Sequence, residues 1–145
     1  MPNKLIVRKS VTIDAPPAEV WEALTHSDWT RKYMFGCDVV SDWEVGDIIE
    51  FPDQHGVVQV KGKILDFEFE RKLEFSCFGP NAGLADIPIN YTTVTYEIHR
   101  ADGKTQLSVL QGDFAGAERG EERYRETLGS WDAVLNKLKE VLEAI

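Results

Sequence analysis

The order of apolar and polar positions predicts that the chain begins with a strand over Leu5–Asp14. Val7, Val11 and Ile13 alternate with polar residues along this segment. Successive side chains of a strand point to opposite faces of the sheet, so this alternation gives one apolar face and one polar face.

Directly after this strand the apolar residues adopt helical spacing. Trp21 and Leu24 lie on the apolar face of a helix predicted over Pro17–Thr25. Proline suits the first turn of a helix because its missing N–H would have no partner there. A second short helix is predicted over Asp28–Met34, ended by Gly36.

From residue 37 to about residue 114 the pattern is typical of strands joined by turns. The predicted strands are Cys37–Val40, Asp47–Pro52, Val57–Glu70, Leu73–Phe78, Tyr91–His99 and Thr105–Gly112. A bend or bulge is expected near Gly62. Gly79–Ile89 is predicted to be a loop, and Asp102-Gly103 is the turn signal of a hairpin.

The C-terminal segment Glu118–Ile145 is predicted to be one long helix of roughly 40 Å. Its apolar residues, including Trp131 and Leu135, follow steps of three and four, and charged residues occupy the other face. Gly129 lies inside this helix, where glycine costs roughly 1 kcal/mol relative to alanine. The favoured explanation for a glycine at this position is that it lets the helix approach the sheet closely. The alternative is that it leaves space for a ligand. Gly112–Gly116 is interpreted as a hinge into the helix.

Short turns between successive strands favour an antiparallel sheet over βαβ units. The predicted fold is therefore α+β. A curved antiparallel sheet of about six to seven strands wraps around a long C-terminal helix, with two short helices after the first strand. A length of 145 residues suits a single domain over residues 1–145.

Composition excludes several classes of partner. The chain has 16 basic and 25 acidic residues, giving a net charge of −9. This balance argues against nucleic acid and against an anionic membrane surface. The N-terminus lacks the apolar run of a secretory signal, and Cys37 and Cys77 form no paired motif, so a cytoplasmic protein with reduced thiols is expected.

Motifs for catalysis or cofactor binding are absent from the sequence, so no metal and no cofactor are expected. The three histidines are scattered without metal-ligand spacing. Asp113 and Glu97 could act as acid or base if they were buried, but a lone carboxylate is weak support for catalysis.

The chain resembles a known group of proteins along nearly its whole length. The residues that carry the resemblance are Ile13-Asp14-Ala15-Pro16, Val20-Trp21, Leu24-Thr25, Trp29, Trp43, Gly46-Asp47, Val60 with Gly62, Phe67-Glu68, Lys72-Leu73, Thr95-Tyr96, Leu107-Ser108-Val109 and Leu128-Gly129-Ser130-Trp131. They are similar to the helix-grip superfamily of START domains and birch-pollen-allergen-like proteins (SRPBCC). Within it, the branch homologous to the activator of the ninety-kilodalton heat-shock protein ATPase is most similar.

The resemblance implies a cavity between sheet and long helix that binds a hydrophobic or amphipathic small molecule or lipid. The candidate ligand-binding residues are Trp29, Tyr33, Phe51, Val60, Phe75, Cys77, Tyr96, Val109, Gln111, Tyr124, Leu128 and Trp131. Strand alternation alone is equally consistent with a solid core, so the preference for a cavity rests on the resemblance to this fold family. A chaperone as partner, as in a stress response, is the alternative, and a cyclase or hydratase is ranked lower. The expected state is a monomer or weak homodimer.

Overall fold

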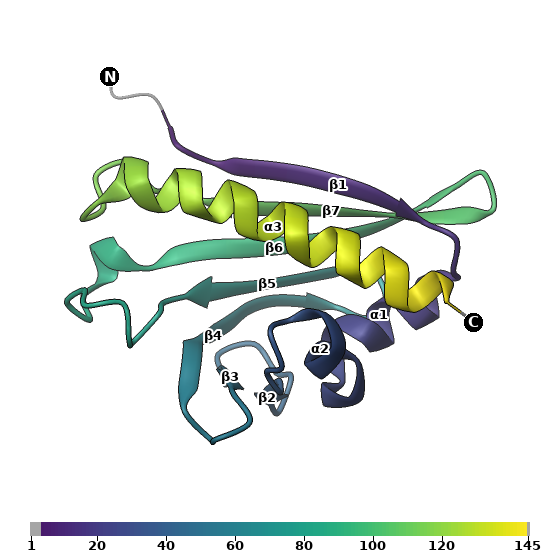
Figure 1. The fold of residues 1–145 in the computed structure, drawn as a ribbon, viewed down its shortest axis with the longest axis horizontal. Helices are drawn as coiled ribbons and strands as arrows, with labels where there is room; N and C mark the ends of the chain where they lie inside the picture. Colours follow the sequence, from purple (N-terminus) through teal and green to yellow (C-terminus); the bar gives the residue numbers. More distant parts are fainter. Residues whose placement is uncertain (1–3, 145) are drawn as a thin grey trace.

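The computed structural model describes residues 4–144 and is drawn in Figure 1. The elements along the chain are β1 (Val7–Ile13), α1 (Pro17–Thr25), α2 (Ser27–Tyr33), β2 (Val40–Ser41), β3 (Ile48–Pro52), β4 (Val58–Glu68), β5 (Lys72–Cys77), a single 3-10 turn (Pro88–Asn90), β6 (Thr92–Ala101), β7 (Lys104–Gly112) and α3 (Gly120–Glu143). The predicted helix Pro17–Thr25 is confirmed residue for residue.

All seven strands form one antiparallel sheet in the order β1-β7-β6-β5-β4-β3-β2. Helix α3 runs across one face of this sheet, and α1 and α2 lie near the C-terminal end of α3 (Figure 1). The predicted α+β helix-grip architecture is thereby confirmed. Its physical basis is that the sheet has one apolar face, which the apolar stripe of α3 covers.

An ion pair and a hydrogen bond join α3 to the edge strand β1. Lys9 Nζ lies 2.9 Å from Asp132 Oδ1. Further along the helix, Lys139 Nζ donates to the carbonyl oxygen of Thr12 at 2.7 Å. These contacts, together with buried Leu138 on the inner face of the helix, attach the C-terminal half of α3 to the sheet. Within residues 4–144, no helix is long and apolar enough to cross a membrane.

Several predicted boundaries differ from the structure. Of the strand predicted over Cys37–Val40, only Val40 is in β2, because the backbone N–H of Cys37 donates to Met34 in a turn that ends α2. The loop predicted over Gly79–Ile89 overlaps at its end with the 3-10 turn Pro88–Asn90, and α3 begins at Gly120 rather than Glu118. The predicted end of α3 at Ile145 lies outside the described residues.

The sheet irregularity predicted near Gly62 is confirmed, because the register of β4 shifts on both sides of this residue. It shifts against β5 between Ile64 and Asp66, and against β3 between Val58 and Val60. Gly62 has a different reason to be glycine. A Cβ atom built at Gly62 would lie 1.6 Å from the carbonyl oxygen of Ser76 on the neighbouring strand. Only glycine, which has no Cβ, permits this close approach of the two backbones.

The position of Gly129 contradicts both predicted reasons for a glycine there, namely close approach of helix and sheet and space for a ligand. The residue is exposed, and a Cβ atom at this position would meet no heavy atom within 4 Å. Gly129 therefore lies on the solvent side of α3, where it neither brings the helix close to the sheet nor leaves room for a ligand.

The same substitution at these two glycines is expected to change stability in opposite directions. Gly62→Ala should lower the free energy of unfolding by about 2–3 kcal/mol, because the new methyl group overlaps the Ser76 carbonyl. Gly129→Ala should raise it by about 1 kcal/mol, because alanine has the higher helix propensity. Urea unfolding followed by circular dichroism measures both values. Two changes of the same sign would contradict this account.

Candidate functional site

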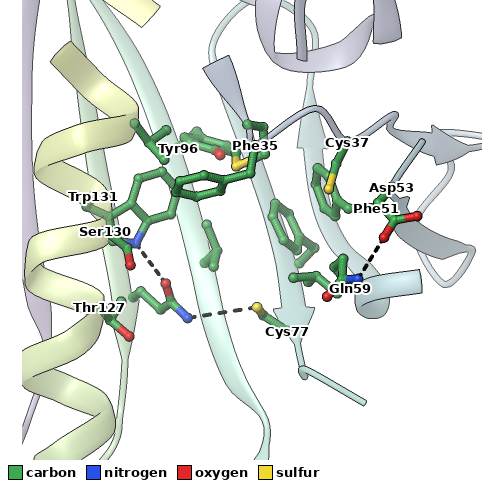
Figure 2. A pocket seen from close by; sticks show the side chains of 16 residues that line it. Phe35, Cys37, Phe51, Asp53, Gln59, Cys77, Tyr96, Thr127, Ser130 and Trp131 are labelled. Atoms are coloured by element: carbon green, nitrogen blue, oxygen red, sulfur yellow. Dashed lines mark hydrogen bonds between the residues drawn. The ribbon is translucent and has the colours of Figure 1, made fainter. Parts of the chain in front are cut away.

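A cavity of about 490 Å³ lies between the sheet and α3 (Figure 2). Strands β3 to β7, helix α3 and the segment after α2 all contribute to its wall. The lining residues are Met34, Phe35, Cys37, Phe51, Asp53, Gln59, Val60, Phe75, Cys77, Val94, Tyr96, Gln111, Thr127, Ser130, Trp131 and Val134. The space beneath the helix is therefore not filled by side chains.

Four aromatic rings form a continuous series along the cavity wall. The ring centroids of Phe51 and Phe75 are 5.8 Å apart, and those of Phe75 and Tyr96 are 6.1 Å apart. Tyr96 then meets the indole of Trp131 edge-on, with centroids separated by 5.8 Å. The series crosses from β3 through β5 and β6 to α3, and it gives the cavity a rigid apolar lining.

Gln111 on β7 links the helix to the sheet by hydrogen bonds. Its Oε1 accepts from Trp131 Nε1 at 2.7 Å. Its Nε2 donates to Thr92 Oγ1 at 3.0 Å, with Cys77 Sγ at 3.8 Å. The bridge satisfies the indole N–H and the Gln111 amide in an otherwise apolar region, and it fixes the position of Trp131 relative to the sheet.

The hydroxyl group of Tyr96 is available to a ligand. Tyr96 is 3% exposed and lines the cavity. Within residues 4–144, no other group forms a hydrogen bond with its Oη. Every fully buried polar side-chain atom in these residues has a hydrogen-bond partner, so the unpaired Oη is not fully buried and is consistent with an atom that faces the cavity. Burial raises the pKa of Tyr96 well above its usual value, so the phenol stays neutral and can both donate and accept.

Asp53 is the charged residue among the described lining residues, and its carboxylate is already engaged. It accepts hydrogen bonds from the backbone N–H groups of His55 and Val57 at 2.8 and 3.0 Å, and from Gln59 Nε2 at 3.0 Å. The backbone N–H of His55 is the main cause of the lowered pKa of Asp53. This carboxylate therefore stays ionised and shapes the β3–β4 turn.

Phe35 covers part of the cavity from the solvent side. It is 70% exposed, and its ring extends toward the side of the cavity that Trp131 occupies (Figure 2). Its backbone has a φ of 51°, in the left-handed region that bulky residues rarely adopt. This conformation places a large apolar ring at the solvent boundary of the site.

The structure brings seven of the twelve sequence-predicted residues to the cavity wall. These seven are Phe51, Val60, Phe75, Cys77, Tyr96, Gln111 and Trp131. The remaining five do not line it and contribute to packing. Tyr33 donates its hydroxyl to the Ala23 carbonyl at 2.6 Å, Val109 is buried in the core, Tyr124 packs edge-on against Phe114, and Trp29 and Leu128 pack partly buried against the core.

Nine lining residues were not among the predicted site residues, and they come from different parts of the fold. Thr127, Ser130 and Val134 lie on the same helical face as Trp131, so helical periodicity could have identified them. Val94 on β6 follows the same alternation as Tyr96. The other five are Asp53 in the β3–β4 turn, Gln59 at the start of β4, and Met34, Phe35 and Cys37 after α2, and their approach to the cavity depends on tertiary packing.

The carboxylates considered for catalysis lie away from the cavity. Asp113 is exposed and accepts the backbone N–H groups of Leu5 and Ala115 at 2.8 and 2.9 Å. Glu97 lies 3.6 Å from His99 and is not on the cavity wall. Asp113 thus joins the β7–α3 connection to the N-terminal segment. In the described part of the chain, no three His, Cys, Asp or Glu side chains form a group able to hold a metal ion.

A family model described as Activator of Hsp90 ATPase homolog 1-like protein (AHSA1) matches residues 14–143. The chain belongs to the AHSA1 family. This confirms the relationship predicted from the sequence motifs. No curated protein matches the chain.

Solved structures share the AHSA1 fold over nearly the full chain. The solution structure of ChR145 from Cytophaga hutchinsonii is 33% identical, covers 99% of this chain and 97% of that one, and has a TM-score of 0.79. An Aha1 dimer from Colwellia psychrerythraea is 18% identical, with coverage of 95% and 96% and a TM-score of 0.75. PFC0360w, an HSP90 activator from Plasmodium falciparum, is 17% identical, with coverage of 94% and 95% and a TM-score of 0.69. The last two establish similarity of fold.

Cys77 on the cavity wall is expected to be unreactive near neutral pH. Burial raises the pKa of its thiol to about 11, so at pH 8 only about 0.1% is thiolate, against roughly a quarter for an ordinary cysteine. In a Cys37→Ser variant, iodoacetamide should label Cys77 at least about 100-fold more slowly than a cysteine-containing peptide, as measured by mass spectrometry. A rate similar to that of the peptide would contradict the half-buried, neutral thiol.

Proposed function

We propose that this chain binds a hydrophobic or amphipathic small molecule in the cavity between the sheet and α3. The cavity volume of about 490 Å³ supports this, since it falls within the usual range for small-molecule sites. The combination of apolar aromatic walls with a few polar groups, among them the hydroxyls of Tyr96, Thr127 and Ser130, is also typical of such sites.

The energetics favour binding by burial with orientation by a hydrogen bond. Apolar surface removed from water contributes about 25 cal/mol per Å². A ligand that buries about 200 Å² would gain roughly 5 kcal/mol before the entropic cost of association is subtracted. A hydrogen bond to Tyr96 adds about 0.5–1.5 kcal/mol and selects ligands with a polar atom at the matching position.

The proposed mechanism is sequestration rather than catalysis, because the candidate acids Asp113 and Glu97 are not on the cavity wall. The test is a panel of fatty acids, sterols and aromatic compounds. Binding should raise the melting temperature and give ligand-bound species in native mass spectrometry, and it should alter the fluorescence of Trp131. If every compound leaves the melting temperature unchanged and only free protein is detected, the proposal fails.

Tyr96→Phe should separate hydrogen bonding from burial. Naphthol and naphthalene differ by one hydroxyl group, so they form a matched pair of probes. The variant should bind naphthol about 5- to 10-fold more weakly, because one hydrogen bond is lost, and should bind naphthalene as the wild type does. Isothermal titration calorimetry measures both affinities. Equal losses for the two probes would indicate that the hydroxyl does not contact the ligand.

The family description favours a second candidate, association with an Hsp90-type ATPase. A cavity-filling variant such as Val94→Phe distinguishes the two functions. We expect it to abolish probe binding, because Val94 lines the cavity. We expect no stimulation of a bacterial Hsp90 ATPase by the wild-type chain. Stimulation that persists in Val94→Phe would support a chaperone partner that binds outside the cavity.

A further inference from the structure

A second, smaller cavity of about 190 Å³ adjoins the large one. The two share three lining residues, Cys77, Gln111 and Thr127. Residues that line only the small cavity include Arg119 and Arg123 at the start of α3, and Ala82 and Leu84 from the loop after β5. The small cavity thus lies next to the large one, across the side chains of Cys77, Gln111 and Thr127, and carries charged residues that the large cavity lacks.

The two arginines are positioned by backbone carbonyl groups. Arg119 Nη2 donates to the carbonyl of Ala82 at 2.8 Å. Arg123 Nη2 donates to the carbonyl of Asn90 at 3.0 Å, and its guanidinium lies 5.5 Å from the centroid of the Phe114 ring. Arg123 Nη1 also donates to the carbonyl of Glu118 at 3.4 Å. These contacts use only part of the five N–H donors of each guanidinium, so further N–H groups remain available.

The positive charges of Arg119 and Arg123 are not neutralised by an ion pair. No carboxylate of residues 4–144 lies within 4.0 Å of either guanidinium, although the chain is strongly acidic overall. Burial lowers the pKa of Arg123, and the charge of Arg119 lowers it further. Two adjacent cations facing a cavity favour an anionic occupant, and arginine binds carboxylate and similar groups with directional hydrogen bonds.

Other charges near the two cavities constrain the orientation of such an occupant. Asp53 lines the large cavity but not the wall that the cavities share, and it lies on the opposite side from Thr127 (Figure 2). An anionic group is therefore disfavoured near Asp53 and favoured near the arginines. Glu126 also lines the small cavity, so its carboxylate opposes anion binding there.

We propose that Arg119 and Arg123 bind the carboxylate, or a similarly small anionic group, of an amphipathic ligand whose apolar body occupies the large cavity. This inference rests on the proposed function and specifies its ligand class. The apolar body contributes affinity through burial, and the arginine pair selects acidic amphiphiles over neutral ones.

Two fluorescent probes of similar shape test the inference on the full chain. N-phenylnaphthylamine is neutral, whereas anilinonaphthalene sulfonate carries one anionic group. We expect the double variant Arg119→Gln/Arg123→Gln to bind the sulfonate at least about tenfold more weakly and the neutral probe within about twofold of wild type. Arg125→Gln on the same helix should change neither affinity, because Arg125 is exposed and does not line the cavity.

Glu126→Gln provides a test that leaves both arginines in place, should the double variant fail to fold. Removing this carboxylate should strengthen binding of the sulfonate about two- to fivefold and leave the neutral probe unchanged. An unchanged ratio of the two affinities in this variant, or in a folded double variant, overturns the inference. Wild-type protein that binds only the neutral probe overturns it while the proposed function stands. If neither probe binds, and the fatty acids, sterols and aromatic compounds do not bind either, both fail.

Discussion

The contact of Trp131 with Tyr96 and Gln111 determines how α3 lies on the sheet. The indole ring meets Tyr96 edge-on, and its N–H donates to Gln111, which in turn donates to Thr92. A large ring fixed from two directions keeps the helix at a set distance from the sheet. Toward the C-terminus of α3, Leu135 and neighbouring apolar residues are buried in the core. Toward the N-terminus the helix stands over the two cavities.

This arrangement separates the parts of the molecule that provide stability from those that form the site. The C-terminal half of α3 packs against β1 and the core, with the Lys9–Asp132 ion pair at the edge. The other half packs through Tyr124 and Leu128, but the residues it turns to the cavities include the small polar side chains of Thr127 and Ser130. A cavity inside a protein forfeits dispersion contacts and costs stability. The packed half of the helix offsets that cost.

Polar groups around the cavities differ in how much of their hydrogen-bonding capacity the protein already uses. Asp53 accepts three hydrogen bonds in its own turn, and Gln111 bridges the helix and the sheet. Tyr96, Arg119 and Arg123 line the cavities and retain unused hydrogen-bonding capacity. Membership of the AHSA1 family establishes the fold, but a fold hosts many functions. The polar groups with unused hydrogen-bonding capacity, rather than the architecture, therefore indicate which class of ligand the cavities favour.

Sequence alone determined the elements of this protein and their order, because the spacing of apolar residues is a local property. Helix Pro17–Thr25, the hairpin around Asp102-Gly103 and the long C-terminal helix follow from that spacing and from turn residues. Alternation also placed Phe75 and Tyr96 on the inner face of the sheet.

Only the tertiary structure decided whether that inner face encloses a solid core or a cavity. The answer depends on the distance between helix and sheet, which is set by contacts between residues far apart in the chain, such as Gln111 and Trp131. The same holds for the two glycines. Gly62 is required by the backbone of Ser76 on another strand, and Gly129 faces solvent. The arginine pair likewise acquires its role from the loop that folds against the start of α3.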